Sequence, residues 1–185
     1  MSDEFLEQLA RHFAAFEQRA RGGFGGLSEE EFNRARSDGG WSIGQCLQHL
    51  VTSNEAYFPI FERVAAGTCE STIWQRLPWL PGLLGDAVLR TVHPENAKKS
   101  KAPRIFRPRA GQVPRAVLDA FCAQQRRLIV VVRSLHGADL DRIITSPVAV
   151  FITYSVRHAL QILDAHEERH LRQAEGVLAE LGVWR

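Results

Sequence analysis

Long apolar runs are missing from this sequence. No window approaches the roughly 18 apolar residues of a membrane-spanning helix. The first ten residues, MSDEFLEQLA, are acidic and amphipathic, whereas a secretion signal is basic and then apolar. Cysteine is scarce, and Cys46, Cys69 and Cys122 are far apart and form no CxxC pair. We therefore expect free thiols in a cytoplasmic protein that has no membrane partner.

A strong net charge is missing as well. The 23 lysines and arginines nearly balance the 21 aspartates and glutamates, which leaves a formal charge of +2. Basic residues do gather in KKSKAPRIFRPR (98–109), but Phe106 is the one aromatic residue among them. The run is more typical of a solvated loop than of a nucleic-acid patch, so we expect no nucleic-acid partner.

What the sequence does contain is helical periodicity. Its 185 residues, 45% apolar and 24% charged, suit a single globular domain over 1–185. Apolar residues recur at helical spacing in four stretches, 3–21, 42–65, 114–137 and 153–182. The β-prone runs LIVVV and VAVFIT do not change this, because the first lies inside a helical period and the second is short. The pattern predicts an all-α four-helix bundle with a long connection between its second and third helices.

The second helix has the clearest start. Ser42 and Gln45 have the spacing of a capping box, and Ser28 with Glu31 predicts a short extra helix in the same way. Pro59 predicts a kink near the end of the second helix. The connection 67–113 holds five of the eight prolines, so we expect only short helical turns around PGLLGDAVLR. Its length and its aromatic residues Trp74, Trp79 and Phe106 suggest a cover over a small-molecule substrate.

The stretch HEERH (166–170) carries the chemistry. Residues four apart share one face of a helix, so His166 and His170 could hold one cation with two nitrogens. The extended zinc-protease motif would continue with glycine and histidine where Gln173 and Gly176 stand. The other protease form needs a glutamate from a later helix. The fifteen residues after His170 contain only Glu175 and Glu180, and both belong to the same predicted helix as His170. A protease is therefore disfavoured.

A third ligand would have to come from another helix of the bundle. His49 is the best candidate, because small residues such as Cys46 and Ser53 flank it at helical spacing. Spacing alone leaves two alternatives open. His49 could be a hydrogen-bonded core histidine, and the pair at 166 and 170 could face solvent.

Two motifs resemble one known family. GGWSIGQCLQHL and DAHEERHLRQ, with KAPRIFRP between them, are similar to the DinB-like (YfiT-like) metalloenzymes. The resemblance implies a four-helix bundle with a long connection after the second helix, and His49, His166 and His170 as ligands of one divalent metal. It also implies a thiol-dependent transferase that uses a low-molecular-weight thiol, or a relative without an assigned reaction, and it allows a homodimer.

Three neutral imidazoles leave the charge of the metal intact and a coordination position open, which is typical of a catalytic site. Zinc or nickel, and also iron, suit such ligands. The site could then run hydrolysis or thiol transfer. Glu167 is a candidate base, and Glu167 and Asp164 are candidate acceptors for the second N–H of a ligand histidine. The alternative is a metal-binding or stress-response bundle without turnover.

Overall fold

The structure is a computed structural model that describes residues 2–69, 72–76, 79–96, 98 and 101–182. Its first helix, α1 (Ser2–Phe24), buries one face formed by residues such as Leu9, Phe13 and Phe16. It runs three residues beyond the predicted end, because Gly22 and Gly23 remain helical. The predicted capping box of Ser28 and Glu31 is present and starts α2 (Glu29–Asn33).

The second predicted helix is not kinked at Pro59 but is broken into two separate helices. α3 (Ile43–Glu55) begins at Ser42, whose side chain accepts from the amide of Gln45, and the reciprocal capping bond is also present. The chain then turns at Ala56 and continues as α4 (Phe58–Ala65), with Pro59 in its first turn. Proline has no amide hydrogen to donate to the preceding turn, so it begins a new helix more readily than it continues an old one.

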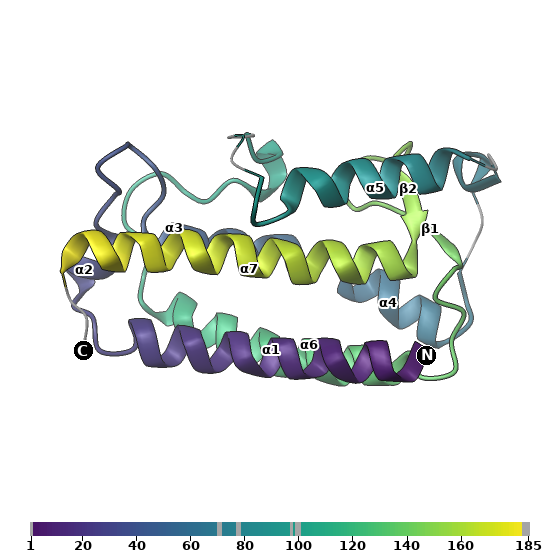
Figure 1. Ribbon diagram of the computed structural model, residues 1–185, viewed down its shortest axis with the longest axis horizontal. Helices are drawn as coiled ribbons and strands as arrows, with labels where there is room; N and C mark the ends of the chain where they lie inside the picture. The colour runs from purple at the N-terminus through teal and green to yellow at the C-terminus, as the bar shows by residue number, and fades with distance from the viewer. Residues whose placement is uncertain (1, 70–71, 77–78, 97, 99–100, 183–185) are drawn as a thin grey trace.

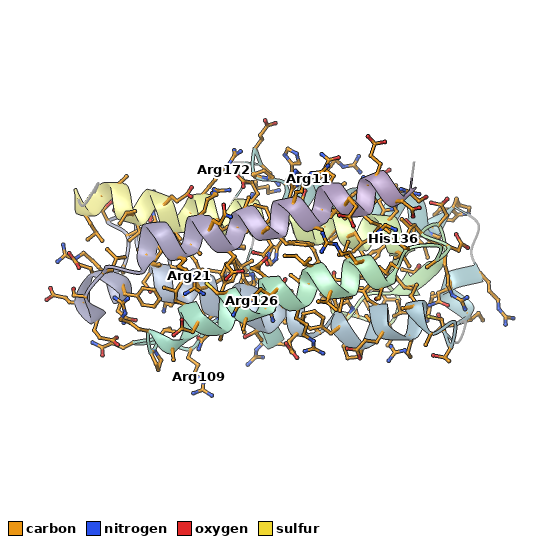
Figure 2. All side chains as sticks on the ribbon, turned by 90° about the horizontal axis from the view of Figure 1, so that it is seen from below. Arg11, Arg21, Arg109, Arg126, His136 and Arg172 are labelled. Atoms are coloured by element: carbon orange, nitrogen blue, oxygen red, sulfur yellow. The ribbon has the colours of Figure 1, made fainter. Side chains whose placement is uncertain are left out.

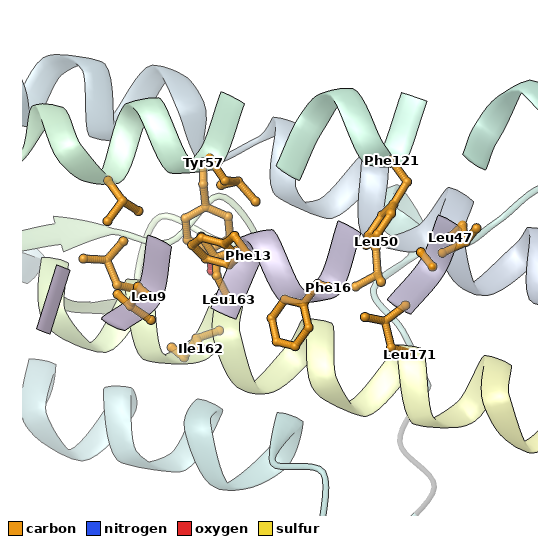
Figure 3. Packing of buried hydrophobic residues seen from close by; sticks show 14 of the residues in the cluster. Leu9, Phe13, Phe16, Leu47, Leu50, Tyr57, Phe121, Ile162, Leu163 and Leu171 are labelled. Atoms are coloured by element: carbon orange, nitrogen blue, oxygen red, sulfur yellow. The ribbon is translucent and has the colours of Figure 1, made fainter. Parts of the chain in front are cut away.

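Four long helices build the bundle. They are α1, α3, α6 (Ala116–Ser134) and α7 (Val156–Leu181). α1 packs on α6 and α7, and α3 packs on the same two helices (Figure 1). The predicted four-helix bundle is confirmed. Between the helices lies a core of aromatic and aliphatic side chains, among them Phe16, Leu50, Phe121 and Leu171 (Figure 3), while charged side chains such as Arg21 and Arg126 lie on the outside (Figure 2).

The long connection between the second and third bundle helices is confirmed, but it is more regular than predicted. It contains η1 (Ile73–Arg76), α5 (Leu80–Val92) and η2 (Arg104–Phe106). α5 lies along α7, on the side away from α1 and α6 (Figure 1). Gly85 lets α5 approach α7 closely, because a Cβ at that position would stand 2.7 Å from the His158 ring. Packing therefore stabilises a 13-residue helix in which proline and glycine lower the intrinsic propensity.

The expectation of no strand is wrong for one short pair. β1 (Ile143–Thr145) and β2 (Thr153–Ser155) pair antiparallel, with Ile144 opposite Tyr154. The ladder leads directly into α7, where the Ser155 side chain accepts from the amide of His158. Tyr154 is fully buried and its hydroxyl lies 2.7 Å from that of Tyr57, so the pair closes this end of the bundle.

The cysteines are free, as predicted, with Cys46 and Cys122 buried in the core. Within the described part of the chain, every helix is too short or too polar to span a lipid bilayer.

The cap at Ser42 gives a stability test. Ser42→Ala removes a buried acceptor, so we expect the free energy of unfolding to fall by about 1 kcal/mol or slightly more in urea denaturation. Ser28→Ala removes the matching cap of the exposed five-residue helix α2, and we expect less than half of that loss. Equal losses would show that the position of α3 does not depend on its cap.

Candidate metal centre

Two helices supply the three histidines. His166 and His170 lie one turn apart in the middle of α7. His49 comes from α3, about two turns after Ser42. α3 and α7 pack directly against each other, so the positions of the rings follow from the packing of two bundle helices. The sequence separation between His49 and His166 is 117 residues.

The three rings converge on one point. Each offers one nitrogen, and these nitrogens lie within 4.8 Å of one another. The Nε2 atoms of His49 and His166 are 3.0 Å apart, and the ring centroids of the three pairs are 4.6 to 4.9 Å apart. Ligand nitrogens on a tetrahedral zinc ion would be spaced by about 3.3 Å, given Zn–N bonds of about 2.0–2.1 Å. The donor set therefore fits a divalent ion of this kind.

Hydrogen bonds on the outer ring nitrogens select the tautomer that could bind a metal. His49 Nδ1 lies 2.7 Å from the carbonyl oxygen of Phe106, and His170 Nδ1 lies 3.0 Å from Oε1 of Gln173. Both partners are acceptors, so Nδ1 carries the hydrogen and the lone pair of Nε2 points toward the other rings. Partners of this kind orient histidine ligands in metal sites.

The electrostatics of the site keep the imidazoles neutral. Burial lowers the pKa of His49, and the bond to the Phe106 carbonyl opposes this in part. Burial, with the neighbouring imidazoles and the charge of Arg169, lowers the pKa of His166 well below its usual value. Burial and the charge of His49 lower the pKa of His170 to about 3. A metal ion would thus meet three deprotonated nitrogens at neutral pH.

Trp41 forms one wall of the site. Its ring stacks on His170 with centroids 5.6 Å apart and planes 23° from parallel. The centroids of the Trp41 and His49 rings are 4.9 Å apart. The residue immediately precedes the Ser42 cap, so the start of α3 places the indole as well as His49. Its bulk restricts ring rotation and shields one side of the imidazoles from water.

Glu167 points away from the three histidines, into the bundle core. Its side chain is fully buried, and Oε1 accepts from the side-chain amides of Asn54 on α3 and Gln125 on α6, the latter at 2.9 Å. Burial raises its pKa to about 7, against the effect of the two amide donors. The role of Glu167 as a base stays a prediction, and this position gives it no contact with the imidazole nitrogens.

Asp164 also has a different partner from the one expected. Its carboxylate accepts from His12 Nδ1 of α1 at 3.0 Å. Among the hydrogen bonds of the described residues, none joins Asp164 or Glu167 to the three histidines. The acceptors that the structure provides, Gln173 and the Phe106 carbonyl, were missed at the sequence level. Gln173 could have been found from its spacing of three from His170, whereas a main-chain carbonyl carries no sequence signal.

A cavity of about 770 Å³ opens beside the histidines. His170, Trp41 and Gln173 line it on the side of the bundle. Residues from the long connection line it on the other side, among them Pro94, Asn96 and Arg107. Part of the predicted cover therefore lies over the site. Phe106 is buried beside it, but Trp74 and Trp79 are exposed and are absent from the cavity lining.

Comparisons with known proteins agree with this fold. The model of the DinB superfamily matches residues 8–174. The uncharacterized protein YuaE of Bacillus subtilis (strain 168) is 26% identical over 156 residues, which are 82% of this chain and 86% of that protein. The structure of YfiT from Bacillus subtilis, a four-helix bundle of unusual topology, superimposes with a TM-score of 0.62 at 14% identity, and the match covers all of this chain and 91% of YfiT.

The resemblance that the two histidine motifs indicated is thus confirmed at the level of the family. The match extends from the first turns of α1 to the part of α7 that follows His170, so it includes all three histidines. The chain belongs to the DinB superfamily.

Proposed function

We propose that the chain is a divalent-metal-dependent hydrolase of a small molecule that binds in the cavity beside His170. The observation that carries the proposal is the convergence of three neutral imidazole nitrogens from two helices, together with the cavity that one of the three residues, His170, lines. Three protein ligands leave room for water or substrate, as in catalytic zinc sites. A divalent ion bound there would act as a Lewis acid and would activate water.

The protein residues would have distinct roles. His49, His166 and His170 would hold the ion, and Phe106 and Gln173 would keep two of the rings in the ligating tautomer. Trp41 would exclude water from one side of the rings. Imidazole ligands suit zinc and nickel, and also iron. The solved relative YfiT is described as a probable metal-dependent hydrolase, which supports the same reaction class here. The family match over 8–174 supports one domain.

The reaction class is tested by activity. Metal-free protein would be loaded separately with Zn²⁺, Ni²⁺ and Fe²⁺ and incubated with a panel of small esters and amides. We expect hydrolysis that a chelator abolishes and that His170→Ala lowers by about 100-fold, the scale of losing one metal-site contact. His136→Ala is the matched control, because His136 contacts Asp3 and Glu7 away from the cavity.

Two outcomes would replace the proposal. Turnover that appears only when a small thiol is added would identify a thiol-dependent transferase. Metal binding without turnover, across all three metals and with or without thiol, would identify a non-catalytic metal-binding bundle.

A further inference from the structure

The cavity beside the histidines is strongly cationic. Five of its lining side chains carry a positive charge, and Asp38 is the one acidic residue among them. The cationic residues are Arg36, Lys101, Arg107, Arg169 and Arg172. They come from three separate parts of the chain, namely the loop before α3, the connection between α5 and α6, and α7. Arg172, one of these lining residues, lies on the outside of the bundle at α7 (Figure 2).

Two of these charges are balanced by acids. Arg36 lies 3.5 Å from Asp38 and 3.4 Å from Glu180. Arg172 lies 2.5 Å from Glu168. Glu168 also pairs with Arg19, so Arg36 adds little net charge to the cavity and Arg172 adds less than a full charge.

Arg107 and Arg169 are held differently. Arg107 donates through Nε to the carbonyl of Ala102 at 2.9 Å. Arg169 donates to the carbonyls of His93, Asn96 and Lys98 at 2.7 to 3.2 Å. Carbonyl groups fix the position of a guanidinium but do not neutralise it. Among the described residues, no ion pair joins Arg107 or Arg169 to a carboxylate, so two fixed cations remain without a balancing charge.

Part of the basic run KKSKAPRIFRPR contributes to this cavity. Lys101 and Arg107 belong to that run and line the cavity, while Lys99 and Ser100 lie outside the described residues. Arg169 immediately precedes His170 in the chain, and both residues line the cavity. Lys101 and Arg107 are exposed, as predicted for a solvated loop, but their position in the lining of the same cavity as His170 was not predicted.

We propose that the ligand of this cavity carries an oxyanion, a carboxylate or a phosphate, that binds Arg107, Arg169 and Lys101 while its reacting group lies against His170. A guanidinium fork matches the geometry of either oxyanion, and charge-assisted bonds of this kind are stronger than neutral ones. The inference deepens the proposed function and rests on it for the reacting end of the ligand. The anion-binding end depends only on the cationic side chains.

Binding of three matched probes tests the proposal. Phenyl phosphate, benzoate and benzyl alcohol would be titrated by calorimetry into the metal-loaded chain and into the metal-free chain. We expect at least one of the two anions to bind about tenfold or more tightly than the neutral probe, because charge-assisted hydrogen bonds are roughly twice as strong as neutral ones. We also expect weaker binding of that anion as salt is raised, since exposed charges are screened.

Three variants locate the binding site. Arg107→Gln and Lys101→Gln change exposed side chains, and each should weaken the anion severalfold or more without changing the affinity for benzyl alcohol. Arg104→Gln is the matched control, because Arg104 is an exposed residue of η2, between Lys101 and Arg107 in the chain, and is absent from the cavity lining. Equal affinities for charged and neutral probes, or an equal effect of Arg104→Gln, would overturn the proposal. The stronger of the two anions identifies the oxyanion.

The same titrations separate this inference from the proposed function. A chain that binds the metal and hydrolyses a substrate but does not distinguish the anions from benzyl alcohol would contradict the oxyanion site alone. A chain that binds the anions at Arg107 but holds no metal would contradict the metal-dependent hydrolase and would leave the cationic cavity as a binding site.

Discussion

His49→Ala should reduce the metal content of the protein, after loading and gel filtration, from one ion per chain to less than a tenth of an ion. The variant leaves only His166 and His170, one turn apart on α7, and two nitrogens from a single helix hold a cation weakly. Loss of a direct ligand should cost about 100-fold or more in affinity, since loss of an outer-sphere partner alone costs 10–100-fold. Elemental analysis gives the stoichiometry directly.

Two companion variants make this result interpretable. His49→Asn keeps an amide donor near the position of Nδ1 for the Phe106 carbonyl, so a loss of metal in this variant cannot be attributed to an unpaired buried carbonyl. His136→Ala removes a partly exposed histidine that contacts acids of α1, and it should keep full metal content. Unchanged stoichiometry in both His49 variants would mean that the ion, if any, binds to α7 alone.

Glu167→Gln should change how stability depends on pH. Burial raises the pKa of Glu167 from 4.5 to about 7, so the folded chain holds this proton more tightly than the unfolded chain does. The stabilisation from that proton is complete below about pH 4.5 and is lost as pH rises through about 7. At about 1.4 kcal/mol per pH unit, this group lowers the free energy of unfolding by about 3 kcal/mol between those values.

The amide variant lacks the titrating group, so its free energy of unfolding should fall less than that of the wild type over pH 4.5 to 8. Both proteins contain the three histidines, whose lowered pKa values make the free energy of unfolding rise with pH up to about 6.5. The difference between the wild-type and variant curves therefore reports Glu167 alone. Urea denaturation of metal-free protein at closely spaced pH values measures both. Parallel curves for Glu167→Gln would contradict a protonated Glu167.

The neighbours of Glu167 provide a reason for this proton. Oε2 of Glu167, Oδ1 of Asn54 and Oε1 of Gln125 are buried and have no hydrogen-bond partner among the described residues. A protonated carboxyl could donate to one of these two amide oxygens, which an ionised carboxylate cannot do. The burial of Glu167 in the core, directly after His166 in the sequence, can thus be explained by these hydrogen bonds without a catalytic role.

Local signals predicted most of the fold. The capping boxes at Ser28 and Ser42 depend on neighbours within one helical turn, which a sequence displays directly. α5 was not predicted in full, because its stability comes from packing on α7 through Gly85. The β1–β2 pair was missed for a similar reason, since a three-residue ladder is specified by its partner strand more than by its own composition.

The three histidines also divide into a part that local spacing predicts and a part that depends on packing between distant helices. The pair at 166 and 170 is visible as a helical repeat. His49 is a candidate from the small residues that flank it, but only the family resemblance singles it out as a ligand, because packing across 117 residues has no local signature. The clustering of cationic side chains around one cavity could not be predicted from the sequence. Lys101 and Arg107 are neighbours in a basic run, and only the folded connection places them beside Arg169.

The separation of the three histidines along the chain also has a consequence for folding. His49 can meet His166 and His170 only after α3 has docked on α7, because the two helices are far apart in sequence. A chain with formed but undocked helices would offer an ion the weaker pair alone. Metal affinity would then report native tertiary structure, and the ion would act as a cross-link that adds stability in proportion to the logarithm of its free concentration.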